Sequence, residues 1–157
     1  MNYNILILVL TMLFSFTACK KDSVTLSNNV FINKTIHQIN VIGYKDGLAQ
    51  TQCSFSLSSN ETKSVFTLNN RGIGNGLAFG GYFRYIDSFV VKFDNTYNIS
   101  HYKPNLIGNN VKYYEFNTNR NLFNEGNFIS LITKDEKYRR ELDFNYTFIE
   151  QDYLDSK

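Results

Sequence analysis

The chain has 157 residues, with 16 Lys and Arg against 14 Asp and Glu, and a formal net charge of +2. This length suits one domain with a buried core, and the mixed charges exclude the basic surface typical of nucleic-acid binding and the polybasic patch of some membrane-binding proteins. With 14 Phe, 11 Tyr, 9 Gly and a single Pro, the composition excludes a disordered chain and favours β-structure.

Near the start of the chain, residues 5–16 are almost all apolar, and Lys20 and Lys21 follow soon after. This run is shorter than the about 20 apolar residues of a transmembrane helix. Thr17 and Ala18 are small residues directly before a cysteine, which is typical of a cleaved signal peptide. We therefore predict a signal peptide over residues 1–18.

The segment Phe16-Thr17-Ala18-Cys19 resembles the lipobox of bacterial lipoproteins. The resemblance implies that Cys19 becomes the first mature residue and carries acyl chains such as palmitate. Lys20 stands where many bacteria use an Asp to retain lipoproteins in the inner membrane, so we expect anchoring to the outer membrane, on either its periplasmic or its surface face.

The second cysteine, Cys53, has no partner for an internal disulfide once Cys19 is lipidated. An exposed thiol would be a liability in an oxidising envelope, so we predict that Cys53 is buried.

After the anchor, residues 20–28 are polar and short and predict a tether, with the folded domain spanning residues 29–157. Residues 30–32 and 36–44 are rich in β-branched and aromatic side chains and predict strands. The second of these ends near Asp46-Gly47, a pair that favours a tight hairpin turn.

The next strand is predicted over residues 51–57, whose apolar positions alternate with polar ones and place Cys53 on the core side. Another is predicted over residues 63–69. Residues 69–81 then contain five of the nine glycines and predict a long loop.

The clearest hairpin combines residues 88–93 and 97–102, because Asp94-Asn95 supplies a turn between them. Pro104 and the polar residues around it predict a connection, followed by a short strand over residues 111–116.

Residues 120–126 are polar and predict at most one helical turn. Two more strands, residues 128–133 and 141–149, flank a charged turn over residues 134–140. The last strand alternates strictly and turns four side chains toward the core: Leu142, Phe144, Tyr146 and Phe148.

Eight or nine short strands without an amphipathic helix predict an all-β fold, an antiparallel β-sandwich for which immunoglobulin-like topology is one arrangement. A small β-barrel is the alternative. The predicted core contains Phe55, Leu57, Phe89, Val91, Phe93, Leu142, Phe144 and Phe148.

Residues with reactive side chains show no catalytic spacing. The glycines at residues 72–76 are not followed by a helix start, which a phosphate-binding loop requires. His37, His101, Asp87 and Cys53 are spread along the chain without the pattern of a nucleophile and base or of a metal site. We predict no cofactor, no metal and no enzymatic activity, against the alternative of a hydrolase whose site forms only in three dimensions.

The glycine-rich loop offers a candidate contact surface, because it combines backbone adaptability with aromatic side chains. The residues proposed for it are Arg71, Phe79, Tyr82, Phe83 and Tyr85.

Residues 19–22, 87–94 and 146–153 resemble segments of small uncharacterised β-rich lipoproteins of Bacteroidota-type bacteria. The resemblance implies a membrane-anchored envelope protein and assigns no active-site residue. We expect a binding or accessory module that recognises an envelope protein or a glycan and no nucleic acid. An inhibitor or immunity-type protein and a purely structural role are the alternatives.

Overall fold

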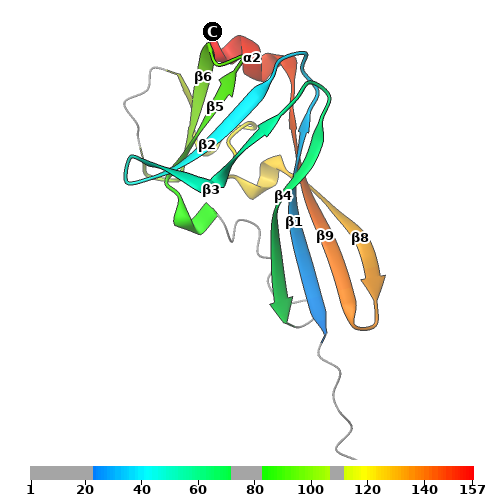
Figure 1. Cartoon of the computed structure of the whole chain (residues 1–157). Helices are drawn as coiled ribbons and strands as arrows, with labels where there is room; N and C mark the ends of the chain where they lie inside the picture. Colours follow the sequence, from blue (N-terminus) through cyan, green and yellow to red (C-terminus); the bar gives the residue numbers. More distant parts are fainter. Residues whose placement is uncertain (1–22, 72–82, 107–111) are drawn as a thin grey trace, which may run out of the picture.

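Two β-sheets pack face to face in the computed structural model, which describes residues 23–71, 83–106 and 112–157 (Figure 1). The sheets do not close into a barrel, so the predicted β-sandwich is confirmed. Sheet A has the strand order β4-β1-β9-β8, and sheet B has the order β3-β2-β5-β6-β7. The strands of sheet A are β1 (Val24–Asn33), β4 (Thr62–Arg71), β8 (Ile129–Glu136) and β9 (Arg139–Phe148).

Sheet B contains the remaining five strands. They are β2 (Ile39–Lys45), β3 (Leu48–Leu57), β5 (Ser88–Phe93), β6 (Tyr97–Tyr102) and β7 (Tyr113–Tyr114). Two short 3₁₀ turns, η1 (Phe83–Tyr85) and η2 (Glu125–Asn127), connect strands, and the helix α2 (Glu150–Ser156) follows β9.

The sheets are mixed, whereas the sequence predicts purely antiparallel pairing. β1 runs parallel to β9, from Val24 beside Arg139 to Asn33 beside Phe148, and β7 runs parallel to β6. Parallel pairing joins segments far apart in the chain, so no local turn signals it.

The first described strand begins at Val24, so the predicted tether over residues 20–28 is wrong from that position onward. The inward side chains in the first half of β1 are Thr25, Ser27 and Asn29, and all three are buried. Because polar residues take the inner positions here, the usual alternation of apolar inside and polar outside is missing. Pairing with β4 and β9 on both sides fixes this segment as a strand.

The two hairpin turns that the sequence predicts are confirmed. Asp46 and Gly47 have φ of 50° and 78° between β2 and β3, and Asp94 and Asn95 have φ of 49° and 58° between β5 and β6. Left-handed backbone of this kind favours Gly, Asn and Asp, which makes such turns readable in the sequence.

The core between the sheets is aromatic, and all eight predicted core residues are buried. Phe31 on β1 lies at its centre, with ring centroids 4.6 Å from Phe55 and 6.2 Å from Phe148. Cys53 is also buried, as predicted, and burial raises the pKa of its thiol.

The bounds of two predicted segments are corrected. Within residues 111–116, the described strand is Tyr113–Tyr114 alone. The charged turn is shorter than residues 134–140, since β8 extends to Glu136 and β9 starts at Arg139.

The helix α2 was not predicted. The Asp152 carboxylate accepts a hydrogen bond from the Ile149 backbone N–H at 2.9 Å and so caps the helix start.

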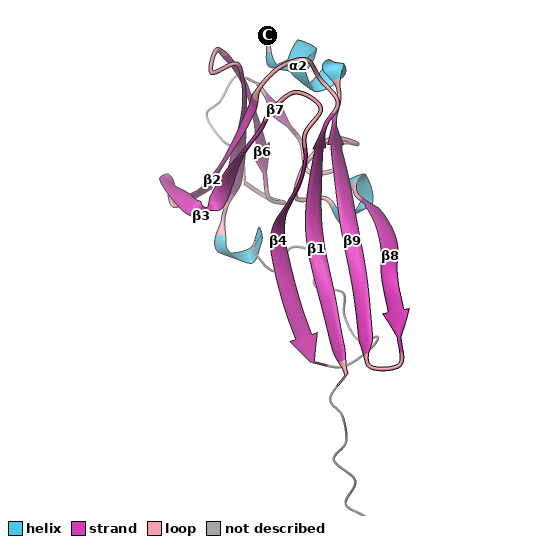
Figure 2. Cartoon of the chain, turned by 45° about the vertical axis from the view of Figure 1, so that its right-hand side comes forward, coloured by secondary structure: helices cyan, strands magenta, loops and turns pink. Residues whose placement is uncertain are grey.

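The strands of sheet A extend beyond the region that sheet B covers. Figures 1 and 2 show β4, β1, β9 and β8 continuing past sheet B to a free end where β1 starts and β8 turns into β9, whereas α2 lies at the opposite end of the molecule. We call the part of sheet A beyond sheet B the projecting half.

Candidate binding surfaces

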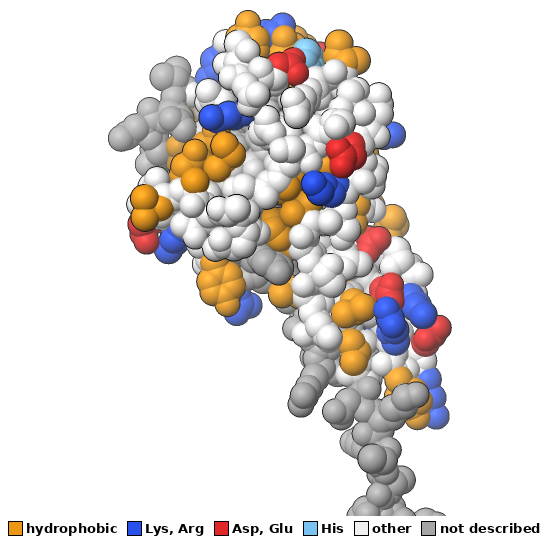
Figure 3. Space-filling model, viewed as in Figure 1, with side chains coloured by type: hydrophobic (Ala, Val, Ile, Leu, Met, Phe, Trp, Pro, Cys, Tyr) orange, Lys and Arg blue, Asp and Glu red, His pale blue; other side chains and the backbone are white. Residues whose placement is uncertain are grey.

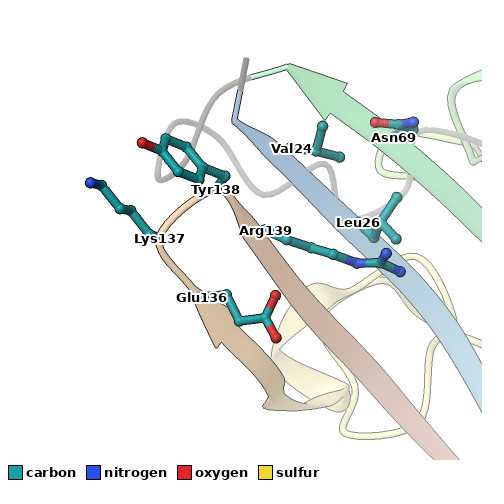
Figure 4. A pocket seen from close by; sticks show the side chains of 7 residues that line it. All are labelled: Val24, Leu26, Asn69, Glu136, Lys137, Tyr138 and Arg139. Atoms are coloured by element: carbon teal, nitrogen blue, oxygen red, sulfur yellow. The ribbon is translucent and has the colours of Figure 1, made fainter. Parts of the chain in front are cut away.

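A hollow of about 620 Å³ lies at the free end of sheet A (Figure 4). Three segments form it: the start of β1, the end of β4 and the turn from β8 to β9. The side chains that line it are Val24, Leu26, Asn69, Glu136, Lys137, Tyr138 and Arg139. It therefore combines apolar surface from β1 with a polar and charged rim from β4 and the turn.

Backbone hydrogen bonding fixes the turn beside the start of β1. The Val24 N–H donates to the Tyr138 carbonyl oxygen at 2.9 Å, so the turn lies directly beside the first described strand. The Lys137 ammonium lies 5.3 Å from the centre of the Tyr138 ring, within reach of a cation–π interaction.

Charges around the hollow are mostly paired. The Arg139 Nε donates to a Glu141 carboxylate oxygen at 2.6 Å, and the Lys134 ammonium lies 3.2 Å from Glu136. Lys137 differs, because it makes no ion pair with any described residue. Figure 3 shows the resulting mixture of cationic, anionic and apolar side chains over the projecting half.

The strand β8 forms one edge of sheet A and pairs, among the described strands, with β9 alone. Ile129, Leu131 and Ile132 are 67%, 49% and 55% exposed. The pairing shifts register between Ile132 and Lys134, so the regular part of this edge carries apolar side chains and no charge. Such an edge presents backbone donors and acceptors that have no strand partner.

A second hollow of about 270 Å³ lies beside β6 and β7. Its lining includes aromatic, amide and charged side chains: Tyr102, Lys103, Asn105, Leu106, Tyr113, Tyr114, Glu115, Phe116 and Asn117. Tyr102 and Tyr113 meet edge to face with ring centroids 6.1 Å apart. Aromatic faces next to amides and a carboxylate suit a polar ligand with apolar ring faces.

The contact surface predicted on the glycine-rich loop is placed only in part. Phe79 and Tyr82 lie outside the described residues, and Arg71 is the last residue of β4. Phe83 is only 4% exposed and packs edge to face on Phe89 at 5.4 Å, so it belongs to the core and its assignment as a contact residue is wrong. Tyr85 is 63% exposed and remains a candidate.

The side chains considered for catalysis interact with separate partners. His37 Nδ1 lies 2.5 Å from an Asp94 oxygen, whereas the Asp87 carboxylate accepts hydrogen bonds from Lys45 and from the Asp46 N–H, each at 3.0 Å. Within the described ranges, no three His, Cys, Asp or Glu side chains are arranged to hold a metal ion.

His101 is fully buried on β6, where its Nδ1 accepts a hydrogen bond from the Leu122 N–H at 3.1 Å. Burial, together with the positive charge of Arg120, lowers the pKa of His101 to about 3. The imidazole is therefore neutral at physiological pH.

A buried ion pair that the sequence does not predict connects α2 to the sandwich. The Arg120 Nε donates to Asp152 at 2.8 Å, and its Nη2 donates both to Asp152 and to the Thr147 carbonyl oxygen. The Tyr114 hydroxyl oxygen lies 3.1 Å from an Asp152 oxygen and 2.6 Å from an Asp155 oxygen, so its single proton can be donated to either carboxylate. Burial and these carboxylates raise the pKa of Tyr114, which keeps its hydroxyl a donor.

Comparison of the chain with protein-family models, with curated proteins and with solved structures finds no match. None of the helices in the described ranges has both the length and the apolar character needed to cross a bilayer. The fold and its surfaces define a β-sandwich protein with an open edge at β8 and with surface hollows, among them the two described above.

Proposed function

We propose that the protein is a lipoprotein, anchored through Cys19 to the bacterial outer membrane, that binds another envelope protein and catalyses no reaction. The observation that carries the binding part is the open apolar edge of β8. The anchor part is supported by the apolar run and the small residues before Cys19.

An open strand edge suits one kind of partner in particular. An extended peptide can add to the sheet as a further strand, with its backbone bonded to β8 and its side chains packed beside Ile129, Leu131 and Ile132. Edge strands of soluble proteins are commonly protected by Lys, by Pro or by a bulge, because unprotected edges pair with other chains. Here the first charged residue, Lys134, comes after the register shift, so the four residues 129–132 are left open.

Binding is favoured over catalysis because the titratable groups considered for catalysis are buried or already paired with other side chains. Arg120 and Asp152 hold α2, His101 is buried and neutral, and His37 bridges Asp94 and Glu150 at 2.5 and 3.4 Å. These contacts stabilise the fold and leave the described reactive groups without the nucleophile and base arrangement of a hydrolase.

The binding proposal is tested with Leu131→Lys, which places a charge on the open edge without altering the core. Tagged mature protein captures partners from envelope extracts, and we expect Leu131→Lys to lose the partner while keeping the wild-type melting temperature. Ile36→Lys is the matched control, since Ile36 is 80% exposed and lies outside β8. Equal capture by both variants would contradict a role for this edge.

The anchor is tested separately with Cys19→Ser. The wild type should incorporate a fatty-acid label and sediment with membranes, and the variant should do neither. A variant that still partitions with membranes would show that Cys19 is not the anchor.

Glycan binding is a second candidate, favoured by the aromatic hollow beside β6 and β7. Tyr113 is its most accessible ring, at 40% exposed, and Tyr97 is a similarly exposed ring, at 38%, that does not line this hollow. On a glycan array, Tyr113→Ala should abolish a signal that Tyr97→Ala retains, and a signal unaffected by Tyr113→Ala would exclude this hollow.

A further inference from the structure

We propose that the free end of sheet A rests on the lipid headgroups of the membrane, with Lys137 and Tyr138 at the contact, so that α2 points away from the bilayer. This inference rests on the proposed lipid anchor at Cys19 and adds to it an orientation and a membrane-contact surface.

The length of chain between the anchor and the fold sets the distance. Val24 follows Cys19 by five residues, and a fully extended chain advances at most about 3.6 Å per residue. A lipid on Cys19 therefore holds the start of β1 within roughly 18 Å of the headgroup layer. That reach is short beside the length of sheet A, since a strand of ten residues such as β1 alone spans about 33 Å.

The pairing of the strands places the β8–β9 turn at this same end. Because β1 and β9 are parallel, their first residues, Val24 and Arg139, are register partners. The hydrogen bond from the Val24 N–H to the Tyr138 carbonyl then holds the turn beside the point where the anchored segment joins the sheet. Whatever holds Val24 near the membrane also holds Tyr138 there.

The side chains of the turn have the chemistry of a membrane interface. Tyr138 is 38% exposed, and a tyrosine ring with its hydroxyl suits the boundary between acyl chains and water. The Lys137 ammonium, which has no carboxylate partner among the described residues, is available to a lipid phosphate. Val24 and Leu26, both half-buried, supply apolar surface in the adjoining hollow.

This orientation determines how a partner would meet the open edge. β8 runs toward the membrane, with Glu136 nearest to it and Ile129 about 24 Å higher, given about 3.4 Å per residue. A strand added to β8 would therefore run roughly perpendicular to the bilayer. It would contact Ile129, Leu131 and Ile132 above the headgroup layer.

The chain contains no Trp, which allows a single fluorescent reporter at either end. Tyr138→Trp places it at the turn, and Tyr97→Trp places it near α2, where the Tyr97 ring lies 5.8 Å from Tyr153. Both tyrosines are 38% exposed, so the two reporters are matched in solvent access. Each lipidated protein, purified from membranes, is reconstituted into phosphatidylglycerol-containing vesicles whose acyl chains are brominated near the headgroup.

We expect a strong loss of fluorescence for Tyr138→Trp and little loss for Tyr97→Trp. Equal quenching, or stronger quenching at position 97, would overturn the orientation while the anchor stands, provided that both proteins float with the vesicles. Failure of the wild type to float would overturn the anchor and, with it, this inference. Should Tyr138→Trp lower the melting temperature, Lys137→Cys carrying a polarity-sensitive dye gives the same reading, because Cys53 is buried and Cys19 is acylated.

Discussion

The buried His101 predicts a specific dependence of stability on acidity. Its pKa is lowered from 6.5 to about 3 in the folded protein, so the folded state keeps it neutral while the unfolded state can protonate it. The contribution of His101 to the free energy of unfolding is therefore fully present above pH 6.5. It is lost as the pH falls toward 3, because over that range the unfolded chain binds one more proton than the folded chain.

The size of the loss follows from the two pKa values. Between pH 7 and pH 5, protonation of an unfolded histidine with a pKa of 6.5 favours the unfolded state about 25-fold, which corresponds to about 2 kcal/mol. The folded state changes little over the same interval, since both pH values lie well above 3.

Urea unfolding followed by circular dichroism at pH 7 and at pH 5 measures this loss, with His101→Asn as the reference. The asparagine oxygen can accept from the Leu122 N–H but cannot bind a proton at these pH values. We expect the stability advantage of the wild type over the variant to shrink by about 2 kcal/mol on going to pH 5. The two proteins differ only at position 101, so subtracting one from the other isolates the contribution of His101. An advantage that is the same at both pH values would refute the reasoning.

Three further substitutions test the packing. Phe144→Ala should lower the free energy of unfolding by about 3–5 kcal/mol, because it removes a buried ring between the sheets; a loss below about 1 kcal/mol in urea unfolding would contradict that position. Asp152→Ala should cost about 3–5 kcal/mol by leaving the Arg120 guanidinium without its carboxylate, and calorimetry of Arg120→Met/Asp152→Leu should show a smaller loss than the single change. Gly43→Ala should cost about 1–3 kcal/mol, since the new methyl group would lie 2.8 Å from the Cβ of Cys53 and 2.9 Å from its carbonyl oxygen, and an unchanged melting temperature would show that β3 can shift.

Local signals account for the parts of the fold that the sequence predicts. The β5–β6 hairpin depends on Asp94-Asn95, and the inner face of β9 depends on strict alternation from Leu142 to Phe148, so both can be read from a few neighbouring residues. The core follows from the same alternation.

Two elements were missed because residues far away in the sequence, rather than neighbouring residues, determine their structure. The first half of β1 has polar residues inside and becomes a strand because β4 and β9 pair with it on both sides. The helix α2 is held by Arg120, which lies 32 residues before its partner Asp152, a separation that carries no periodic signal. The two acids in its first turn, Glu150 and Asp152, were the one local indication of a helix start.

The candidate surfaces depend on the strand order. The sequence predicts a strand near β8, but only the order β4-β1-β9-β8 makes it an edge. Phe83 was assigned to a contact surface because it is an aromatic residue beside a glycine-rich segment. Only its packing against Phe89 shows that it belongs to the core.

The parallel pairing of β1 with β9 also constrains when the chain can fold. The partners in this ladder, such as Asn28 and Asp143, are 115 residues apart, and β1 lies between β4 and β9 in the sheet. During synthesis β1 can pair with β4 but lacks its second partner until β9, nearly the last strand, has been made, and a chain with many such distant contacts folds slowly. Sheet A therefore cannot be completed until β9 has been made, so a chain threaded through a membrane during synthesis would not yet carry its native sheet A.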